Sequence, residues 1–444
     1  MATTFEVMNP EMTATAPPLR YSFTWTLAGN LIYAACQWGM LSALAKLGSV
    51  AVVGQFALGL AITAPVFMLT NLQLRGVQAT DARSEYEFGH YFTLRLVASL
   101  CGFVIVAWIV LASGYERTTT AVVMLVAAAK AIESVSDVVA GLLQKHERLD
   151  QVAVGLILKG VISVSAFTTA YRLSHRLTLA VLALSCSWAA VALCYDLRLA
   201  LRLEGSVRRF FSADHRTIAR LVMLSAPLGF VLGVSSLGAN IPRYAVARYL
   251  GQSELGIFAS LAYTVLAITF VVNALGQSVV VRLSQLYAAG NYHGFTSFLR
   301  RLVLAVTAIG VIAVVCALAL GRPLLVLLYR PEYGDRVGVL VVIVVATTIS
   351  AVTSFLGCGL TAARAFTPQL PTCITGLITV TILAAFLTPK WGLSGAAMAV
   401  GLSESLRGIV AFAMLTRTLL HANASALDNQ LELLVESEST THAD

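Results

Sequence analysis

Residues 240–263 read NIPRYAVARYLGQSELGIFASLAY, and a weaker copy, CQWGMLSALAKLGSVAVVGQFALGLA, occupies residues 36–61. Within these stretches, Gly54-x-Phe56-Ala57 matches Gly256-x-Phe258-Ala259. Both stretches are embedded in hydrophobic sequence. The chain is therefore predicted to be a duplicated helical bundle, with a working site between the two copies.

The composition indicates a membrane protein. The chain has 444 residues, of which 58% are hydrophobic and 12% charged, and its mean hydropathy is +0.82. Soluble domains carry about 25% charged residues, so this surface is expected to face lipid. The net charge of +8 fits cytoplasmic loops rich in Lys and Arg, and nucleic acid is not an expected partner. The seven cysteines lie in apolar runs without a C-x-x-C pair, which predicts neither disulfides nor a metal site.

The length of the apolar runs favours helices. A membrane-spanning helix needs about 20 mostly apolar residues, whereas barrel strands need about 9–11. The expected fold class is an all-α integral membrane protein with about 12 transmembrane helices in two six-helix bundles related by a parallel repeat. The runs cover residues 22–45, 50–73, 93–112, 120–143, 152–171, 177–197, 220–241, 255–278, 301–321, 337–361, 369–388 and 393–416.

The distribution of Lys and Arg predicts the topology. These residues gather in the segments that are inside if both termini are cytoplasmic, above all between the sixth and seventh runs. The first 20 residues lack the basic region and cleavage site of a signal peptide. The expected domains are a cytoplasmic N-terminal segment (1–21), an N-terminal bundle (22–200), a basic cytoplasmic linker (201–219), a C-terminal bundle (220–417) and a cytoplasmic tail (418–444).

Further matches extend the repeat. Ser134-Val135-Ser136 aligns with Ala351-Val352-Thr353, and Gly160 and Ser187 align with Gly376 and Ser403. Amides are matched as well. Such amides either hold helices together or hydrogen-bond a polar cargo such as sugar hydroxyls. The amide pairs are Gln37 with Asn240 and Asn71 with Asn273.

Charged residues inside the apolar runs are the main functional signal, because an ionisable group in a membrane is costly. Lys130, Glu133 and Asp137 share one helix face. They either pair to make the helix tolerable in lipid or line a water-filled cavity. In a cavity, Lys130 would attract an anionic group, and Glu133 or Asp137 would take up a proton or pair with a cation. Glu404 and Arg407, spaced i, i+3, are expected to pair in a structural role.

Four more basic residues are candidates for binding. Lys159 either extends its ammonium group to the cytoplasmic surface or lines the same cavity. Arg243 and Arg248 either anchor an outer loop or face the cleft between the halves, and Arg75 could face the cleft from the inner side. Arg suits phosphate because its planar guanidinium group binds two oxygens at once.

Catalytic motifs are missing from the sequence. It contains no H-E-x-x-H, G-x-S-x-G or Walker A motif. The chain is therefore not expected to be an enzyme, and no cofactor or metal is expected.

Four further stretches carry a family resemblance. They are AKLGSVAVVGQFALGLAITAPVFMLTNLQLR (45–75), RLSQLYAAGNYHGFTSFLRR (282–301), LLVLLYRPEY (324–333) and WGLSGAAMAVGLSESLR (391–407). Together with residues 240–263, they resemble the polysaccharide and oligosaccharide flippases of the multidrug/oligosaccharidyl-lipid/polysaccharide (MOP) exporter superfamily. The resemblance covers residues 21–417.

The resemblance implies two six-helix bundles that open alternately to either side of the bacterial inner membrane. It implies an undecaprenyl-diphosphate-linked oligosaccharide as cargo and a cationic cleft for the diphosphate. Many relatives carry an acid in the outer part of the seventh helix, where this chain reads NIPRY, so Glu133 and Asp137 are the candidates for ion or proton coupling. The candidates for cargo binding are Arg75, Lys130, Lys159, Arg243, Arg248, Gln37, Asn71, Asn240 and Asn273.

The implied function is flipping for O-antigen, capsule or exopolysaccharide assembly. The implied partners are the lipid-linked oligosaccharide, membrane lipid, a polysaccharide polymerase and a chain-length regulator. Three alternatives stay open: a drug/cation antiporter of the same superfamily, a peptidoglycan-precursor flippase, and a membrane glycan polymerase or ligase. The last usually needs a large outer loop, and no predicted outer loop here is long enough.

Overall fold

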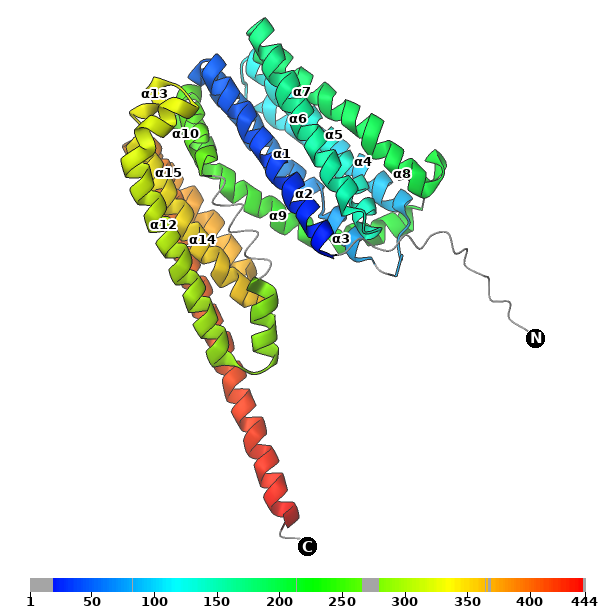
Figure 1. Ribbon diagram of the computed structural model, residues 1–444, viewed down its shortest axis with the longest axis vertical. Helices are drawn as coiled ribbons and strands as arrows, with labels where there is room; N and C mark the ends of the chain where they lie inside the picture. Colours follow the sequence, from blue (N-terminus) through cyan, green and yellow to red (C-terminus); the bar gives the residue numbers. More distant parts are fainter. Residues whose placement is uncertain are drawn as a thin grey trace, which may run out of the picture. The chain divides into compact units, whose positions relative to one another are not determined.

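The computed structural model describes residues 19–81, 83–212, 214–265, 279–363, 365 and 369–441. Side chains are described over the same ranges except for residues 19–23, 369–370 and 423–441. Within these ranges every regular element is a helix, as the apolar run lengths predict (Figure 1). All seven cysteines are free thiols.

The chain divides into two compact units that do not follow chain order. Unit 1 comprises Met1–Met40, Thr70–Ile109 and Leu125–Gly229, and unit 2 comprises Leu41–Leu69, Val110–Met124 and Phe230–Asp444. Several helices contribute to both units. These units reflect which residues pack together and do not mark domain boundaries along the chain. The domain limits expected from the sequence therefore stay predictions.

Unit 1 is built mainly from the first half of the chain. Helices α6 and α7 pack side by side (Figure 1), and His175 ends α6 in a left-handed conformation (φ 52°). Phe210 packs its ring between Phe88 and Phe92, with centroids 5.1 and 5.2 Å away. The helices are α1 (Leu19–Leu47), α3 (Leu74–Thr80), α4 (Phe88–Ala112), α5 (Arg117–Lys145), α6 (Leu149–Ser174), α7 (Leu177–Val191), a π-helical turn (Ala192–Asp196), α8 (Leu197–Glu204) and a 3-10 turn (Val207–Phe210).

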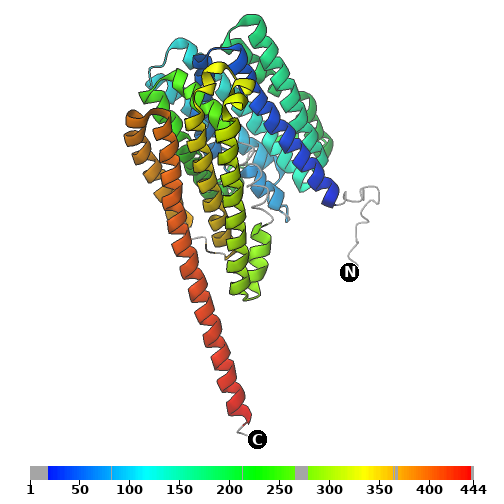
Figure 2. The ribbon, with the colours of Figure 1, turned by 60° about the vertical axis from the view of Figure 1, so that its left-hand side comes forward.

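Unit 2 holds most of the second half. Helices α12, α14 and α15 pack side by side, as Figures 1 and 2 both show. Phe295, Phe355 and Leu415 are among the buried residues of their shared core. The helices are α2 (Val50–Thr70), α9 (His215–Tyr249), α10 (Gln252–Thr264), a helical stretch at 279–288, α12 (Tyr292–Leu328), α13 (Pro331–Gly334), α14 (Val337–Ala362) and α15 (Gln369–Thr441).

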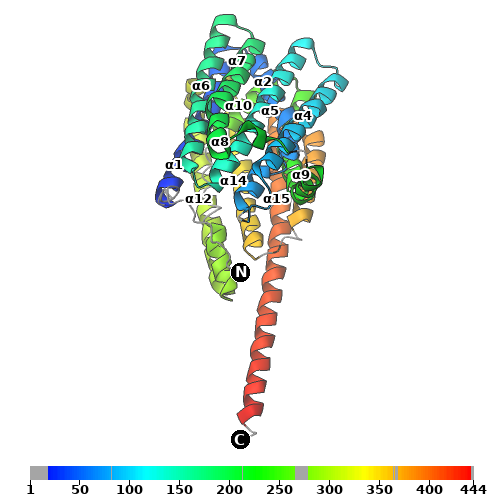
Figure 3. The same cartoon turned by 90° about the vertical axis from the view of Figure 1, so that its right-hand side faces the viewer.

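Helix α15 is two helices joined at a sharp kink. Gly392 has φ 59° and ψ −138°, a conformation that glycine adopts without the steric cost of a Cβ. The kink separates the runs 369–388 and 393–416, as expected for two spans. The second helix continues as a long rod to the end of the described chain (Figures 2 and 3).

Eight of the described helices are long and apolar enough to cross a membrane. One of them, Pro371–Ala422, includes the kink at Gly392 and so covers two of the predicted runs. Helices α1 and α5 also lie over predicted runs but are not among the eight. The all-α membrane fold is confirmed, while the count of twelve spans stays a prediction.

Candidate functional site

The charged face of α5 makes contacts with other helices of unit 1. Lys130 Nζ lies 2.7 Å from Glu133 Oε2, and the hydroxyl of Tyr33 on α1 donates to Glu133 Oε1 at 2.7 Å. The ammonium group of Lys130 also lies 5.5 Å from the centre of the Trp188 ring on α7, within the range of a cation–π interaction. Glu133 therefore joins α1 to α5.

Asp137 is held between two arginines. Arg95 Nη2 lies 3.1 Å from Asp137 Oδ2, and Arg75 Nη1 lies 3.6 Å from Oδ1. The side chain of Arg95 is fully buried and also donates to Asn71 Oδ1 at 2.5 Å. Ser134 donates to the same amide oxygen at 2.8 Å. Asn71 thus holds α4 and α5 together, as one of its two predicted roles requires.

Arg95 was not among the residues singled out by the sequence. It sits near the start of the apolar run 93–112, where a basic residue is typical of the inner end of a membrane span. Helix α4 begins at Phe88, which places Arg95 inside the helix. The available signal was Asp137 itself, because a carboxylate inside an apolar run needs a cationic partner.

Lys159 forms a buried ion pair with Asp196. Lys159 Nζ lies 2.8 Å from Asp196 Oδ2, and both side chains are 8% exposed. Asp196 is the last residue of the π-helical turn after α7, and such turns occur frequently at functional sites. The pair excludes the alternative that Lys159 extends to the surface, and Asp196 is a second residue that the sequence did not indicate.

These ion pairs surround a small cavity, here named the unit-1 pocket. Its volume is about 130 Å³. Two basic side chains of the lining, Arg75 and Lys159, face three acidic ones, and Lys130 and Arg95 pair with two of these acids from outside the lining. The polar lining consists of Tyr33, Arg75, Glu133, Ser136, Asp137, Lys159 and Asp196.

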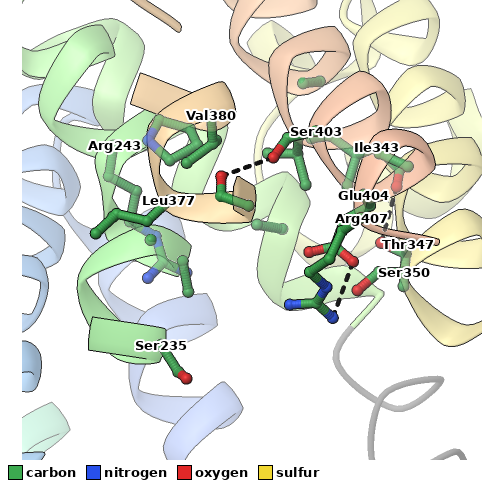
Figure 4. A pocket seen from close by; sticks show the side chains of 18 of the residues that line it. Ser235, Arg243, Ile343, Thr347, Ser350, Leu377, Val380, Ser403, Glu404 and Arg407 are labelled. Atoms are coloured by element: carbon green, nitrogen blue, oxygen red, sulfur yellow. Dashed lines mark hydrogen bonds and ion pairs between the residues drawn. The ribbon is translucent and has the colours of Figure 1, made fainter. Parts of the chain in front are cut away.

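A larger cavity of about 460 Å³ lies within unit 2 and is here named the unit-2 pocket. Arg243 of α9 lies on one side of it, and Glu404 and Arg407 of α15 lie on the other (Figure 4). Arg407 Nη2 pairs with Glu404 Oε2 at 3.0 Å, as the spacing predicts. Both residues of the pair also line the pocket. The hydroxyl groups of the lining belong to Ser235, Thr347, Ser350 and Ser403.

The remaining predicted residues lie outside the lining of both pockets. Gln37 is half-buried on α1, and Arg248 is exposed on α9. Asn240 is buried, donates to the Ser236 carbonyl and accepts from Arg243 Nη1 at 2.6 Å. Asn273 lies outside the described residues. The structure thus brings together Arg75, Lys130, Lys159, Glu133 and Asp137 in unit 1, and Asn240 with Arg243 in unit 2.

The two pockets correspond in the sequence repeat. The alignment of Ser134-Val135-Ser136 with Ala351-Val352-Thr353 pairs Lys130 with Thr347 and Glu133 with Ser350. Thr347 and Ser350 line the unit-2 pocket. Where α5 carries charges, α14 carries hydroxyl groups, so the duplicated cavities have diverged in chemistry.

Known proteins agree with this architecture. A family model described as polysaccharide biosynthesis protein matches residues 19–287. The capsular polysaccharide biosynthesis protein CapF of Staphylococcus aureus is 27% identical over 387 residues, which cover 86% of this chain and 96% of CapF.

Solved structures share the fold at low identity. The lipid II flippase MurJ in an inward closed conformation has a TM-score of 0.73 at 9% identity, with 93% of each chain covered. An inward-facing multidrug resistance MATE family transporter of the MOP superfamily has a TM-score of 0.69 at 12% identity, covering 90% of this chain and 99% of that one.

The chain is a multi-pass membrane protein with the fold of the MOP superfamily transporters. It belongs to the polysaccharide biosynthesis protein family, whose model matches more than half of its length. The fold that it shares with these solved structures is that of transporters.

Proposed function

We propose that this protein is a flippase for undecaprenyl-diphosphate-linked oligosaccharide in the bacterial inner membrane. It works by alternating access in O-antigen, capsule or exopolysaccharide assembly, with both termini in the cytoplasm. The family and the similarity to CapF support polysaccharide biosynthesis as the setting. The shared fold with MurJ, a lipid II flippase, supports a lipid-linked cargo.

The single observation that carries the proposal is the cluster of paired basic and acidic side chains at the unit-1 pocket. Four basic side chains are gathered there against three acids. Arg75 and Lys130 keep 35% and 27% of their side chains exposed, so they are accessible to a ligand. A diphosphate supplies negative charge with which these basic side chains can pair.

The acids have a different role in the proposal. Lys130 forms an ion pair with Glu133, and the hydroxyl of Tyr33 donates a hydrogen bond to it. A diphosphate that enters the pocket would compete with Glu133 for both groups. Release of Lys130 to the cargo leaves Glu133 free to take up a proton. Asp137 is held by Arg75 and by the buried Arg95, and a diphosphate on Arg75 would remove one of these two cationic partners. Both acids therefore couple cargo binding to proton or ion uptake.

The test is complementation of a bacterial mutant that lacks its own flippase. Lys130→Ala is expected to abolish surface polysaccharide while the protein stays in the membrane at the normal level, because the cargo diphosphate loses a cation. Lys390→Ala removes an exposed lysine from unit 2 and serves as the matched control. Normal surface polysaccharide with Lys130→Ala would refute the cationic site. Export of a cationic dye by the purified protein, without flipping, would favour the antiporter alternative.

A further inference from the structure

The unit-2 pocket contains one positive charge without an acidic partner. Arg407 is paired with Glu404, but Arg243 donates only to the amide of Asn240 and forms no ion pair with any described residue. Residues 266–278, 364 and 366–368, which the structure does not describe, include no acidic residue. A half-buried guanidinium group in a membrane span is costly without an anion, so the pocket favours an anionic ligand.

The same pocket has the other surfaces that a sugar needs. Ser403 donates to the Gly376 carbonyl at 2.9 Å and Thr347 to the Ile343 carbonyl at 2.8 Å, which leaves both hydroxyl oxygens able to accept hydrogen bonds. Leu377 and Val380 form an aliphatic wall (Figure 4). A pyranose ring presents hydroxyl groups at its edge and C–H groups on its faces. The edge can hydrogen-bond to the serine and threonine hydroxyls, and a face can pack on the aliphatic side chains.

The size and charge of the pocket restrict the ligand further. Its volume of about 460 Å³ falls within the range of about 300–1,000 Å³ for small-molecule sites. Since Glu404 neutralises Arg407, the net excess is a single charge. One excess charge matches a ligand with a single negative charge.

The sequence repeat indicates that the two pockets bind different chemical groups. The α14 positions that correspond to Lys130 and Glu133 are Thr347 and Ser350. Hydroxyl groups in place of charges suit a polyhydroxylated ligand with weak net charge. The unit-2 pocket therefore suits a different chemical group from the one that the unit-1 pocket suits.

We infer that the unit-2 pocket binds a sugar bearing one carboxylate group, with Arg243 paired to the carboxylate. The inference rests on the proposed function, because it assigns the sugar to the oligosaccharide of the flipped cargo. It makes Arg243 the residue that selects acidic over neutral glycans.

The test compares two synthetic cargo analogues on the full-length protein in nanodiscs of zwitterionic lipid. Both are short-chain prenyl diphosphates that carry a disaccharide, one with glucuronic acid and the other with glucose at the same position. The glucuronic analogue is expected to bind about tenfold more tightly, as one charge-assisted contact provides. Arg243→Gln is expected to remove this preference and leave the affinity for the glucose analogue unchanged.

Two variants separate this inference from the proposed function. Lys130→Ala should weaken the binding of both analogues equally, because Lys130 is expected to contact the diphosphate that both carry. Arg322→Gln removes an exposed positive charge elsewhere in unit 2 and should change neither. If the wild-type protein binds both analogues equally, the carboxylate site is refuted and the flippase proposal stands. If the wild-type protein binds neither analogue, the flippase proposal itself is refuted, and the carboxylate site that rests on it falls as well.

A second measurement does not depend on cargo. Cys373 lines the unit-2 pocket. In a variant whose other six cysteines are replaced, its rate of modification can report the electrostatic potential of the pocket. A negatively charged thiosulfonate reagent is expected to modify Cys373 several-fold faster than a positively charged one of similar size, and glucuronate should slow the reaction more than glucose. Arg243→Gln should abolish the difference in rate. Equal rates in both proteins would overturn the inference, whether or not the variant binds cargo.

Discussion

Gly54 of α2 and Gly256 of α10, which occupy the same position in the two repeats, contact each other within unit 2. A Cβ on Gly54 would overlap the carbonyl group of Gln252, and a Cβ on Gly256 would overlap the carbonyl oxygen of Val50. Gln252 and Val50 are themselves repeat equivalents. The contact is therefore symmetric, and any side chain larger than hydrogen on either glycine would push the two helices apart.

Gly256→Ala is accordingly expected to prevent the close approach of α2 and α10. The two helices belong to different predicted bundles, and the alternating access proposed above depends on how closely they pack. We expect a clear loss of surface polysaccharide in complementation and a lower melting temperature of the purified protein. Gly357→Ala is the control, because a Cβ there meets no atom within 4 Å. Equal behaviour of the two variants would contradict the prediction.

Arg95→Met is expected to destabilise the protein strongly. The change leaves Asp137 and Asn71 without their buried donor, and breaking a buried ion pair costs about 3–5 kcal/mol. Thermal unfolding in detergent measures the effect. Arg202→Met, at an exposed site at the end of α8, should have little effect. The double variant Arg95→Met/Asp137→Asn should recover part of the loss, and simple additivity would argue against the pair.

Lys159 and Asp196 should be strongly coupled in stability. Lys159→Met leaves Asp196 as an uncompensated buried charge, whereas Lys159→Met/Asp196→Leu removes both charges. Since replacing both members of a buried pair by apolar groups is often neutral or stabilising, the double variant should melt above the single one. The four proteins of this double-mutant cycle provide the measurement. A double variant that melts below both single variants would contradict it.

Asp81 should make stability depend on pH. Burial alone raises the pKa of Asp81, but the backbone N–H groups of Glu85 and Tyr86 and the ammonium group of Lys145 together hold it below its usual value. The ionised form is thus favoured in the folded state. Its contribution is present above the unfolded pKa of about 3.9 and is lost as the pH falls through the lower folded value.

The measurement is the melting temperature between pH 7 and pH 3. Wild type should lose more stability over this range than Asp81→Asn, which has no group to titrate. The largely exposed pair of Asp335 with Arg322 offers the control Asp335→Asn, which should follow the wild-type curve. Parallel curves for wild type and Asp81→Asn would refute the assignment.

The sequence by itself determined the fold class, because run length and hydropathy are local properties. It placed helices over the apolar runs that the structure describes, and it placed the break between the last two runs where Gly392 makes the kink. Lys130, Glu133 and Asp137 could be assigned to one helix face for the same reason, since a face follows from spacing along a single helix.

Only the tertiary structure decided the partners. Arg95 meets Asp137 and Asp196 meets Lys159 through packing of separate helices, and neither contact leaves a pattern in a single sequence. The same holds for Gly54 and Gly256, whose match marked a repeat but whose contact needed the crossing of α2 with α10. The sequence shows which charged residues lie in the apolar runs. Which of them are neutralised by an ion pair, and that Arg243 is left without an acidic partner among the described residues, depends on the side chains that the fold brings together.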